Sequence, residues 1–234
     1  MPFTFAHPAA VVPLLRNRTL VPAGLIIGAM SPDFEYFLRL DTVSTHTHTL
    51  PGLVYACVPL GLLGLMLWQG VVRRPFVAAL PGFLRDRVGA LGSSGVPRTA
   101  RAWFWAALSV FIGAVTHLLW DSFTHPGYLP AQWLGLSTWS SLPGWRWTSL
   151  LQRLSDLAGF AVLGVVIARL PRRPVPGAAR PWLFWLVAAL AVVALVGVRT
   201  MLEPDWARLS TMVATLIAGG LLGLLLAAVG SRAR

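Results

Sequence analysis

Five stretches of the sequence are long and apolar enough to cross a lipid bilayer, and no other feature limits the fold so strongly. They cover residues 50–69, 103–120, 150–168, 182–198 and 209–229. A spanning helix needs about 20 mostly apolar residues, and a segment in lipid must satisfy its own backbone hydrogen bonds. The composition agrees, because 56% of the residues are hydrophobic and only 12% are charged, against about 25% in soluble domains. The sequence therefore predicts an all-α, polytopic helical bundle in a membrane.

The N-terminal segment contains two shorter apolar runs, residues 8–16 and 22–30, separated by the polar sequence RNRT. Each run is too short to span a bilayer, and each begins with a proline, which is favoured at the first position of a helix. We expect a short helical hairpin before the first span. Its open end would bring His7, just before the first run, close to Asp33, just after the second.

The formal net charge is +11, and all nineteen basic residues are arginines that lie mostly between the apolar runs. A nucleic-acid-binding protein concentrates its basic residues on a soluble face, so we interpret the charge as a signal of membrane topology. The positive-inside rule places the arginine-rich residues 71–101 and 169–180 in the cytoplasm. Residues 122–149 and 199–208 are then expected outside.

Ionisable residues gather in the apolar segment GAVTHLLWDSFTHPG, residues 113–127. His117, Asp121 and His125 recur every four residues, so on a helix they lie along one face. On the predicted topology all five histidines of the chain fall on the outer side, together with Asp33; they are His7, His46, His48, His117 and His125. Ionisable groups at membrane depth are costly and mark functional sites.

Three interpretations of this cluster compete. The histidines could cap helix ends and anchor them at the interface. A proton or ion pathway is a second interpretation, but it would need polar residues across the bilayer, and the last two apolar stretches offer almost none. The third, which we favour, is a metal site that uses His117 and Asp121 on one helix face with Asp33 and His48. Imidazole and carboxylate together suit zinc, and manganese or iron with less preference.

Four segments carry a resemblance to a known family: MPFTFAHPAAVVPL, GAMSPDFEYFLRL, THTLPG and GAVTHLLWDSFTHPG. They closely resemble the bacterial membrane proteins of domain-of-unknown-function family 4184. More distantly, they are similar to inner-membrane metal-dependent hydrolases, whose pattern is an early His, then PD-x-D, TH-S and SH-x-x-x-D-x-x-T. The resemblance covers residues 1 to about 130, and beyond that point only the hydrophobic helices match.

The hydrolase pattern implies a role for individual residues of this chain. Its metal ligands fall on His7, Asp33, His48, His117 and Asp121. At PD-x-D the chain departs from the pattern, because Glu35 replaces the second aspartate and becomes the candidate general base. The HR that precedes TH-S is absent, which leaves His46 without a counterpart. His46 and His125 are expected to support the ligands or to add to them.

The resemblance implies a divalent metal ion, with zinc preferred, in a hydrolase of the bacterial cytoplasmic membrane. The expected substrate is an amphipathic or lipid-linked ester or phosphoester, reached from the extracytoplasmic side. Expected partners are the bilayer and such a lipid-like substrate, but no nucleic acid. The alternative is a non-catalytic membrane protein whose helices are pinned by a structural metal or a polar network. In either case we expect one integrated membrane domain, with the site in residues 1–130 and an outer loop and C-terminal helices in residues 131–234.

Overall fold

The computed structural model describes residues 3–89, 91, 95–138, 146–203 and 208–232, so residues 139–145 of the predicted outer loop lie outside it. Throughout these residues the regular structure is helical and contains no strand, which confirms the all-α prediction. All five predicted spans are present as long apolar helical segments; they are Leu50–Ala79, Ala100–Trp133, Trp147–Arg169, Pro181–Leu202 and Leu209–Ser231. The chain is therefore a multi-pass membrane protein.

The first long segment is built from three α-helices and two π turns. It comprises α3 (Leu50–Gly52), a π turn (Leu53–Cys57), α4 (Val58–Leu67), a π turn (Trp68–Val72) and α5 (Arg73–Ala79). The helix thus continues past residue 69, the predicted end of the span. Arginine is a good helix former, so Arg73 and Arg74 mark a change in polarity without ending the helix. The end comes where Pro81 favours an extended Leu80, whose ψ is 152°.

The remaining helices follow in sequence order. They are α6 (Gly82–Val88), α7 (Ala100–Thr124), α8 (Leu129–Trp133), α9 (Trp147–Arg169), α10 (Pro181–Leu202) and α11 (Leu209–Arg232). α7 begins with an N-cap, because the Thr99 side chain accepts a hydrogen bond from the backbone N–H of Ala102 at 3.2 Å. It ends at Thr124, so His117 and Asp121 lie in its last two turns.

The predicted N-terminal hairpin is present, with one difference. It consists of the 3₁₀ helix η1 (Thr4–Arg16) and α1 (Pro22–Gly28), which contact each other. α1 has its proline in the first turn, as expected. In contrast, η1 begins at Thr4 and contains Pro8 and Pro13, so His7 lies inside the helix and not before it. These prolines disfavour a regular α-helix in η1, because proline has no N–H to donate and disfavours the α conformation of the preceding residue.

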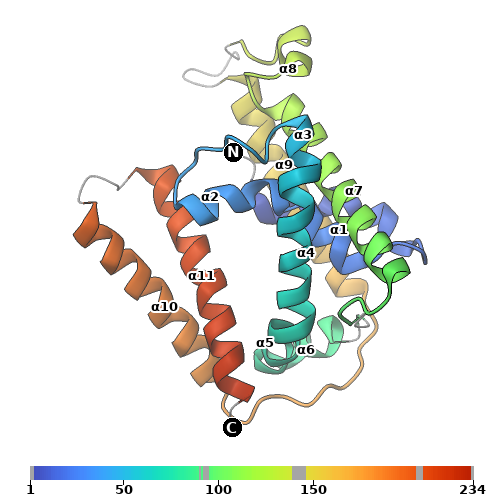
Figure 1. Cartoon of the computed structure of the whole chain (residues 1–234), viewed down its shortest axis with the longest axis vertical. Helices are drawn as coiled ribbons and strands as arrows, with labels where there is room; N and C mark the ends of the chain where they lie inside the picture. The colour runs from blue at the N-terminus through green and yellow to red at the C-terminus, as the bar shows by residue number, and fades with distance from the viewer. Residues whose placement is uncertain (1–2, 90, 92–94, 139–145, 204–207, 233–234) are drawn as a thin grey trace. The chain divides into compact units, whose positions relative to one another are not determined.

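The chain divides into two compact units that are interleaved in the sequence. The first comprises Met1–Asp33, His46–Leu62 and Pro97–Val166, and it holds all five histidines. Within it α1 packs along α7, as Figure 1 shows, and Val11, Leu25 and Ala29 form a buried core. After α1 comes the 3₁₀ turn η2 (Ser31–Asp33).

The second unit comprises Phe34–Thr45, Leu63–Val96 and Ile167–Arg234. It begins with α2 (Phe34–Arg39), and its α10 and α11 lie side by side in Figure 1. The two helices come close at Gly223, where a Cβ atom would lie 2.5 Å from the carbonyl oxygen of Ala188. This is the small-residue packing expected of helices in a bilayer.

Candidate metal centre

Four segments of the first unit bring ionisable side chains into one cluster. His7 comes from η1, Asp33 from η2, His48 from the turn before α3, and His117 and Asp121 from α7. The side chain of His48 is 12% exposed and the other four are 4% exposed or less. The structure thus brings together all five predicted ligands, although they are spread over more than a hundred residues of sequence.

The nitrogen and oxygen atoms of these side chains lie a short distance apart. His117 Nε2 is 3.2 Å from Asp121 Oδ2 and 3.6 Å from Asp33 Oδ1. His48 Nε2 is 3.5 Å from Asp33 Oδ1 and 3.7 Å from Asp121 Oδ2, and His7 Nε2 is 3.6 Å from Asp121 Oδ1. Tetrahedral zinc with ligands at about 2.0–2.2 Å requires ligand atoms about 3.3–3.6 Å apart. The spacing therefore fits that ion.

Several of these atoms are buried without a hydrogen-bond partner among the described residues. They are both ring nitrogens of His7, Oδ1 of Asp33, Nε2 of His117 and Oδ1 of Asp121. A buried polar atom left unsatisfied costs about 1–3 kcal/mol, and a bound ion can satisfy such a group. Two sets of three, His7–Asp33–His117 and His48–His117–Asp121, each offer ligand atoms within 4.8 Å of one another. The donor set fits a divalent cation.

The ring of His117 is held by the backbone of the hairpin. Its Nδ1 lies 2.7 Å from the carbonyl oxygen of Ala29, and a carbonyl can only accept, so Nδ1 carries the hydrogen. In the neutral imidazole Nε2 then keeps its lone pair and faces the two aspartates. A backbone carbonyl bound to the outer nitrogen is the usual arrangement of a metal-ligating histidine.

Two threonines orient the ligands on the other side of the cluster. The hydroxyl of Thr4 donates to Asp33 Oδ2 at 2.5 Å, which leaves Oδ1 facing His48 and His117. The hydroxyl of Thr47 donates to the carbonyl oxygen of Pro32 at 2.6 Å and lies 3.4 Å from His48 Nδ1. Sequence reasoning missed both threonines and Ala29, because only their contacts with distant residues reveal their role.

Burial and neighbouring charges set the protonation of His7 and Asp33, which lie outside the long helices. Burial and the nearby His117 lower the pKa of His7 to about 3. For Asp33, burial alone would raise the pKa, but the nearby His117 and His48 and the hydrogen bond from Thr4 lower it below its usual value. At neutral pH His7 is therefore uncharged and Asp33 is ionised, which are the forms that bind metal.

The other predicted site residues lie in different surroundings. His125, at the C-terminal end of α7, has Nδ1 3.5 Å from Asp121 Oδ1, so it borders the cluster. His46 is exposed, and its Nδ1 lies 3.0 Å from the hydroxyl of Tyr55. Glu35 is buried in the second unit, where its carboxylate accepts hydrogen bonds from Arg39, Ser44 and Thr45. Its role as a general base stays a prediction.

The chain belongs to the family described as Domain of unknown function (DUF4184), whose model matches residues 1–229. The match extends well beyond residue 130, where the recognisable motifs end, and so includes the C-terminal helices. No curated protein and no solved structure matches the chain.

Proposed function

We propose that this member of the DUF4184 family is a membrane-bound, metal-dependent hydrolase. The residues that would hold the ion are His7, Asp33, His48, His117 and Asp121, and zinc is the ion that suits them best. One observation supports this above all: nitrogen and oxygen atoms of these side chains lie 3.2–3.7 Å apart in five histidine–aspartate pairs, and several buried ones have no hydrogen-bond partner within the described part of the chain.

When bound, such an ion supplies Lewis-acid activation of water and of a carbonyl or phosphoryl oxygen. The protein's own side chains provide the rest. The two aspartates offset the charge of the ion, and burial keeps bulk water away from the donor atoms. In the overall reaction the hydroxyl of water joins the acyl or phosphoryl centre, and its proton passes to the departing alcohol. Glu35 is the proposed base that receives the proton first.

The proposed substrate is an amphipathic or lipid-linked ester or phosphoester. One support is the position of His117 and Asp121 near the end of a membrane-spanning helix. Another is Trp120 in the same helix, because tryptophan is typical of the membrane interface. The proposed location is the extracytoplasmic side of the bacterial cytoplasmic membrane. That orientation rests on the distribution of arginines.

A structural ion is the second candidate, and the number of donors favours it. Five side chains from four segments supply two overlapping sets of three donors, and a structural zinc site has four protein ligands and no open position. In that case the ion, or the polar network itself, would pin η1, η2 and the turn before α3 to α7. The two candidates differ in whether a coordination position is left for water.

Elemental analysis of the detergent-purified protein tests the metal itself. We expect about one or two equivalents of zinc, manganese or iron in the wild type and a loss of metal in His117→Ala and Asp121→Ala. His46→Ala is the matched control, because His46 is exposed and contacts Tyr55. X-ray absorption then counts the ligands: an open or water-filled position supports hydrolysis, and four protein ligands support the structural ion. A folded wild type that takes up no metal contradicts both the hydrolase and the structural ion, and leaves the polar network alone to hold these segments to α7.

A further inference from the structure

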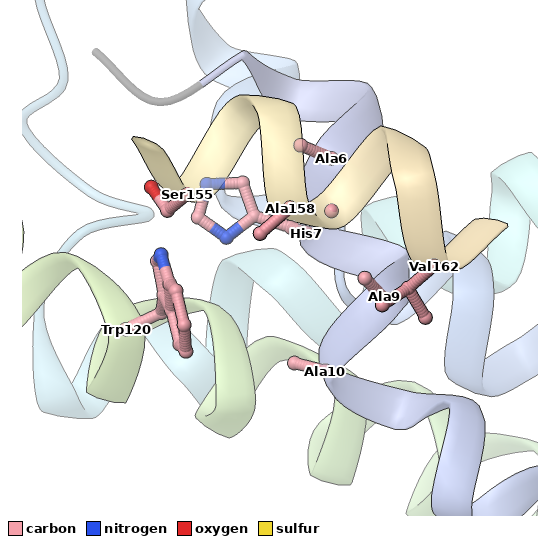
Figure 2. Close-up of a pocket in the computed structure, with 9 residues that line it drawn as sticks. Ala6, His7, Ala9, Ala10, Trp120, Ser155, Ala158 and Val162 are labelled. Carbon is pink, nitrogen blue, oxygen red and sulfur yellow. The ribbon is translucent and has the colours of Figure 1, made fainter. Parts of the chain in front are cut away.

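A pocket of about 190 Å³ lies beside the candidate metal centre, between η1, α7 and α9 of the first unit. Figure 2 shows the imidazole of His7 at this pocket, with Trp120 of α7 and Ser155 of α9 beside it. Both ring nitrogens of His7 lack a hydrogen-bond partner within the described part of the chain, and Nε2 is 3.6 Å from Asp121. The ring of His7 therefore lines the pocket and also contacts the cluster of ligands.

The rest of the pocket is apolar and lined by small side chains. Apart from His7 and Ser155, the lining residues on η1 and α9 are Ala6, Ala9, Ala10, Ala158, Gly159 and Val162. None of the described lining residues is an aspartate, a glutamate or an arginine. Gly159 lets the two helices approach closely, since a Cβ atom there would lie 3.0 Å from the Cβ of Ala6. The pocket accordingly offers van der Waals contact along its length and polar groups only near His7.

The pocket follows one face of α9. Ser155, Ala158, Gly159 and Val162 are spaced i, i+3, i+4 and i+7, so this wall extends over about 10 Å of helix. The neighbouring large side chains of α9 are exposed, with Leu154 at 61% and Leu157 at 70%. Because α9 is one of the membrane-spanning helices, these side chains meet lipid. The pocket thus lies on a helix whose neighbouring apolar side chains are exposed to the hydrocarbon of the bilayer.

We infer that this pocket binds one alkyl chain of a membrane lipid and so presents the polar linkage of that lipid at His7. The inference rests on the proposed hydrolase function, because it makes the bound lipid the substrate. The volume of about 190 Å³ is below the roughly 300–1,000 Å³ of sites that enclose a whole drug-sized ligand. A single chain therefore enters the pocket while the remainder of the lipid stays outside. A second hollow of about 380 Å³ shares Trp120, Ser155 and Ala158 with the pocket and continues the apolar path.

The test uses the full-length protein in vesicles of phosphatidylethanolamine and phosphatidylglycerol that contain a phosphatidylglycerol with a diazirine in its acyl chain. Light attaches the chain to the residues it touches, and mass spectrometry locates them. Ala158→Phe and Ala10→Phe fill the pocket from α9 and from η1. Ala161→Phe is the matched control, because Ala161 is also an exposed alanine of α9 but does not line the pocket.

We expect several-fold less labelling of peptides that contain His7 and Ser155 in the two pocket variants, and no change in Ala161→Phe. All three should keep the metal content of the wild type. Equal labelling in the three variants overturns the inference. It is also overturned if the protein is a dimer that Ala158→Phe dissociates, because a second copy of the chain would then fill the pocket.

Hydrolysis assays distinguish a failure of the inference from a failure of the proposed function. With p-nitrophenyl esters, Ala158→Phe should lower several-fold the ratio of activity on a long acyl chain to activity on the water-soluble acetate, and Ala161→Phe should leave this ratio unchanged. If the pocket variants do not change activity on either chain length, the inference is contradicted but the proposed hydrolase function is not. Pocket-specific labelling of a protein that hydrolyses no ester or phosphoester contradicts the proposed function, and with it the role of the lipid as substrate.

Discussion

The imidazole of His117 donates a hydrogen bond from Nδ1 to the carbonyl oxygen of Ala29 at 2.7 Å, and this contact depends on two glycines. Gly113 lies one turn before His117, and a Cβ atom there would lie 2.6 Å from the backbone nitrogen of Ala29. A Cβ atom at Gly28 would lie 2.2 Å from the carbonyl oxygen of Val110. The backbones of α1 and α7 can therefore meet only without side chains at these two positions.

Gly113→Ala should weaken metal binding without altering any ligand. The new methyl group meets backbone atoms, so α1 must move away and the carbonyl of Ala29 no longer reaches His117. We expect a loss of stability of about 1–3 kcal/mol, measured as a lower Tm, and a lower metal content. Gly164→Ala is the control, because no atom lies within 4 Å of a Cβ at that position. A Gly113→Ala protein with normal metal content would contradict this coupling.

The parts of the fold that depend on local sequence could be predicted. A run of apolar residues long enough to span is a property of the segment alone, so all five spans could be located. The four-residue spacing of His117 and Asp121 likewise fixes their proximity on any helix, and their atoms lie 3.2 Å apart.

The features that sequence reasoning missed depend on contacts between distant segments. Thr4 reaches Asp33, 29 positions away, and the carbonyl of Ala29 reaches His117, 88 positions away; a backbone carbonyl carries no sequence signal at all. From the sequence, the arginines at positions 73 and 74 suggest the end of the helix, but their charge indicates only where the bilayer ends. The helix itself ends before Pro81.

Thr4→Val should lower metal affinity because it removes the hydrogen bond that orients Asp33. The hydroxyl of Thr4 donates to Asp33 Oδ2 at 2.5 Å, and valine has a similar shape without a donor. Loss of such a partner typically costs about 10- to 100-fold in affinity, which competition with a chelator measures. Thr4→Ser keeps the hydroxyl and should bind nearly as tightly as the wild type. Equal affinities of the valine and serine variants would show that this hydrogen bond does not orient the ligand.

The two histidines of the THTHT sequence should behave differently. His48→Ala removes a ring nitrogen that lies 3.5 Å from Asp33 and 3.7 Å from Asp121. It should reduce metal affinity by more than the about 10- to 100-fold expected for an outer partner. His46→Ala should leave affinity unchanged, because His46 is exposed and contacts Tyr55. If His46→Ala loses metal to the same degree as His48→Ala, the assignment of ligands in this turn is wrong.

Glu35→Gln tests the proposed base against a structural role for the same carboxylate. A general base contributes about 10²- to 10⁴-fold to the rate, so turnover should fall by that factor while metal content stays constant. Glu35 accepts hydrogen bonds from Arg39, Ser44 and Thr45. If these contacts are its only role, Glu35→Gln should instead lower Tm and preserve the turnover per folded molecule. Arg39→Gln keeps the carboxylate but removes its ion pair and the hydrogen bond from Arg39 to Thr45, and it shows how much stability these contacts provide.

The metal-free protein should lose stability as the pH falls from about 6.5 towards 3. In the unfolded chain His7 takes up a proton near its ordinary pKa of 6.5, whereas burial lowers the pKa in the folded protein to about 3. Between these values the unfolded state binds more protons, so its free energy falls relative to the folded state on acidification. For one such group the effect is on the order of 1 kcal/mol for each pH unit. Unfolding monitored between pH 4.5 and 6.5 after chelator treatment measures the slope, which should be smaller in His7→Gln. An identical slope in the wild type and in His7→Gln would show that His7 is not held uncharged in the folded protein.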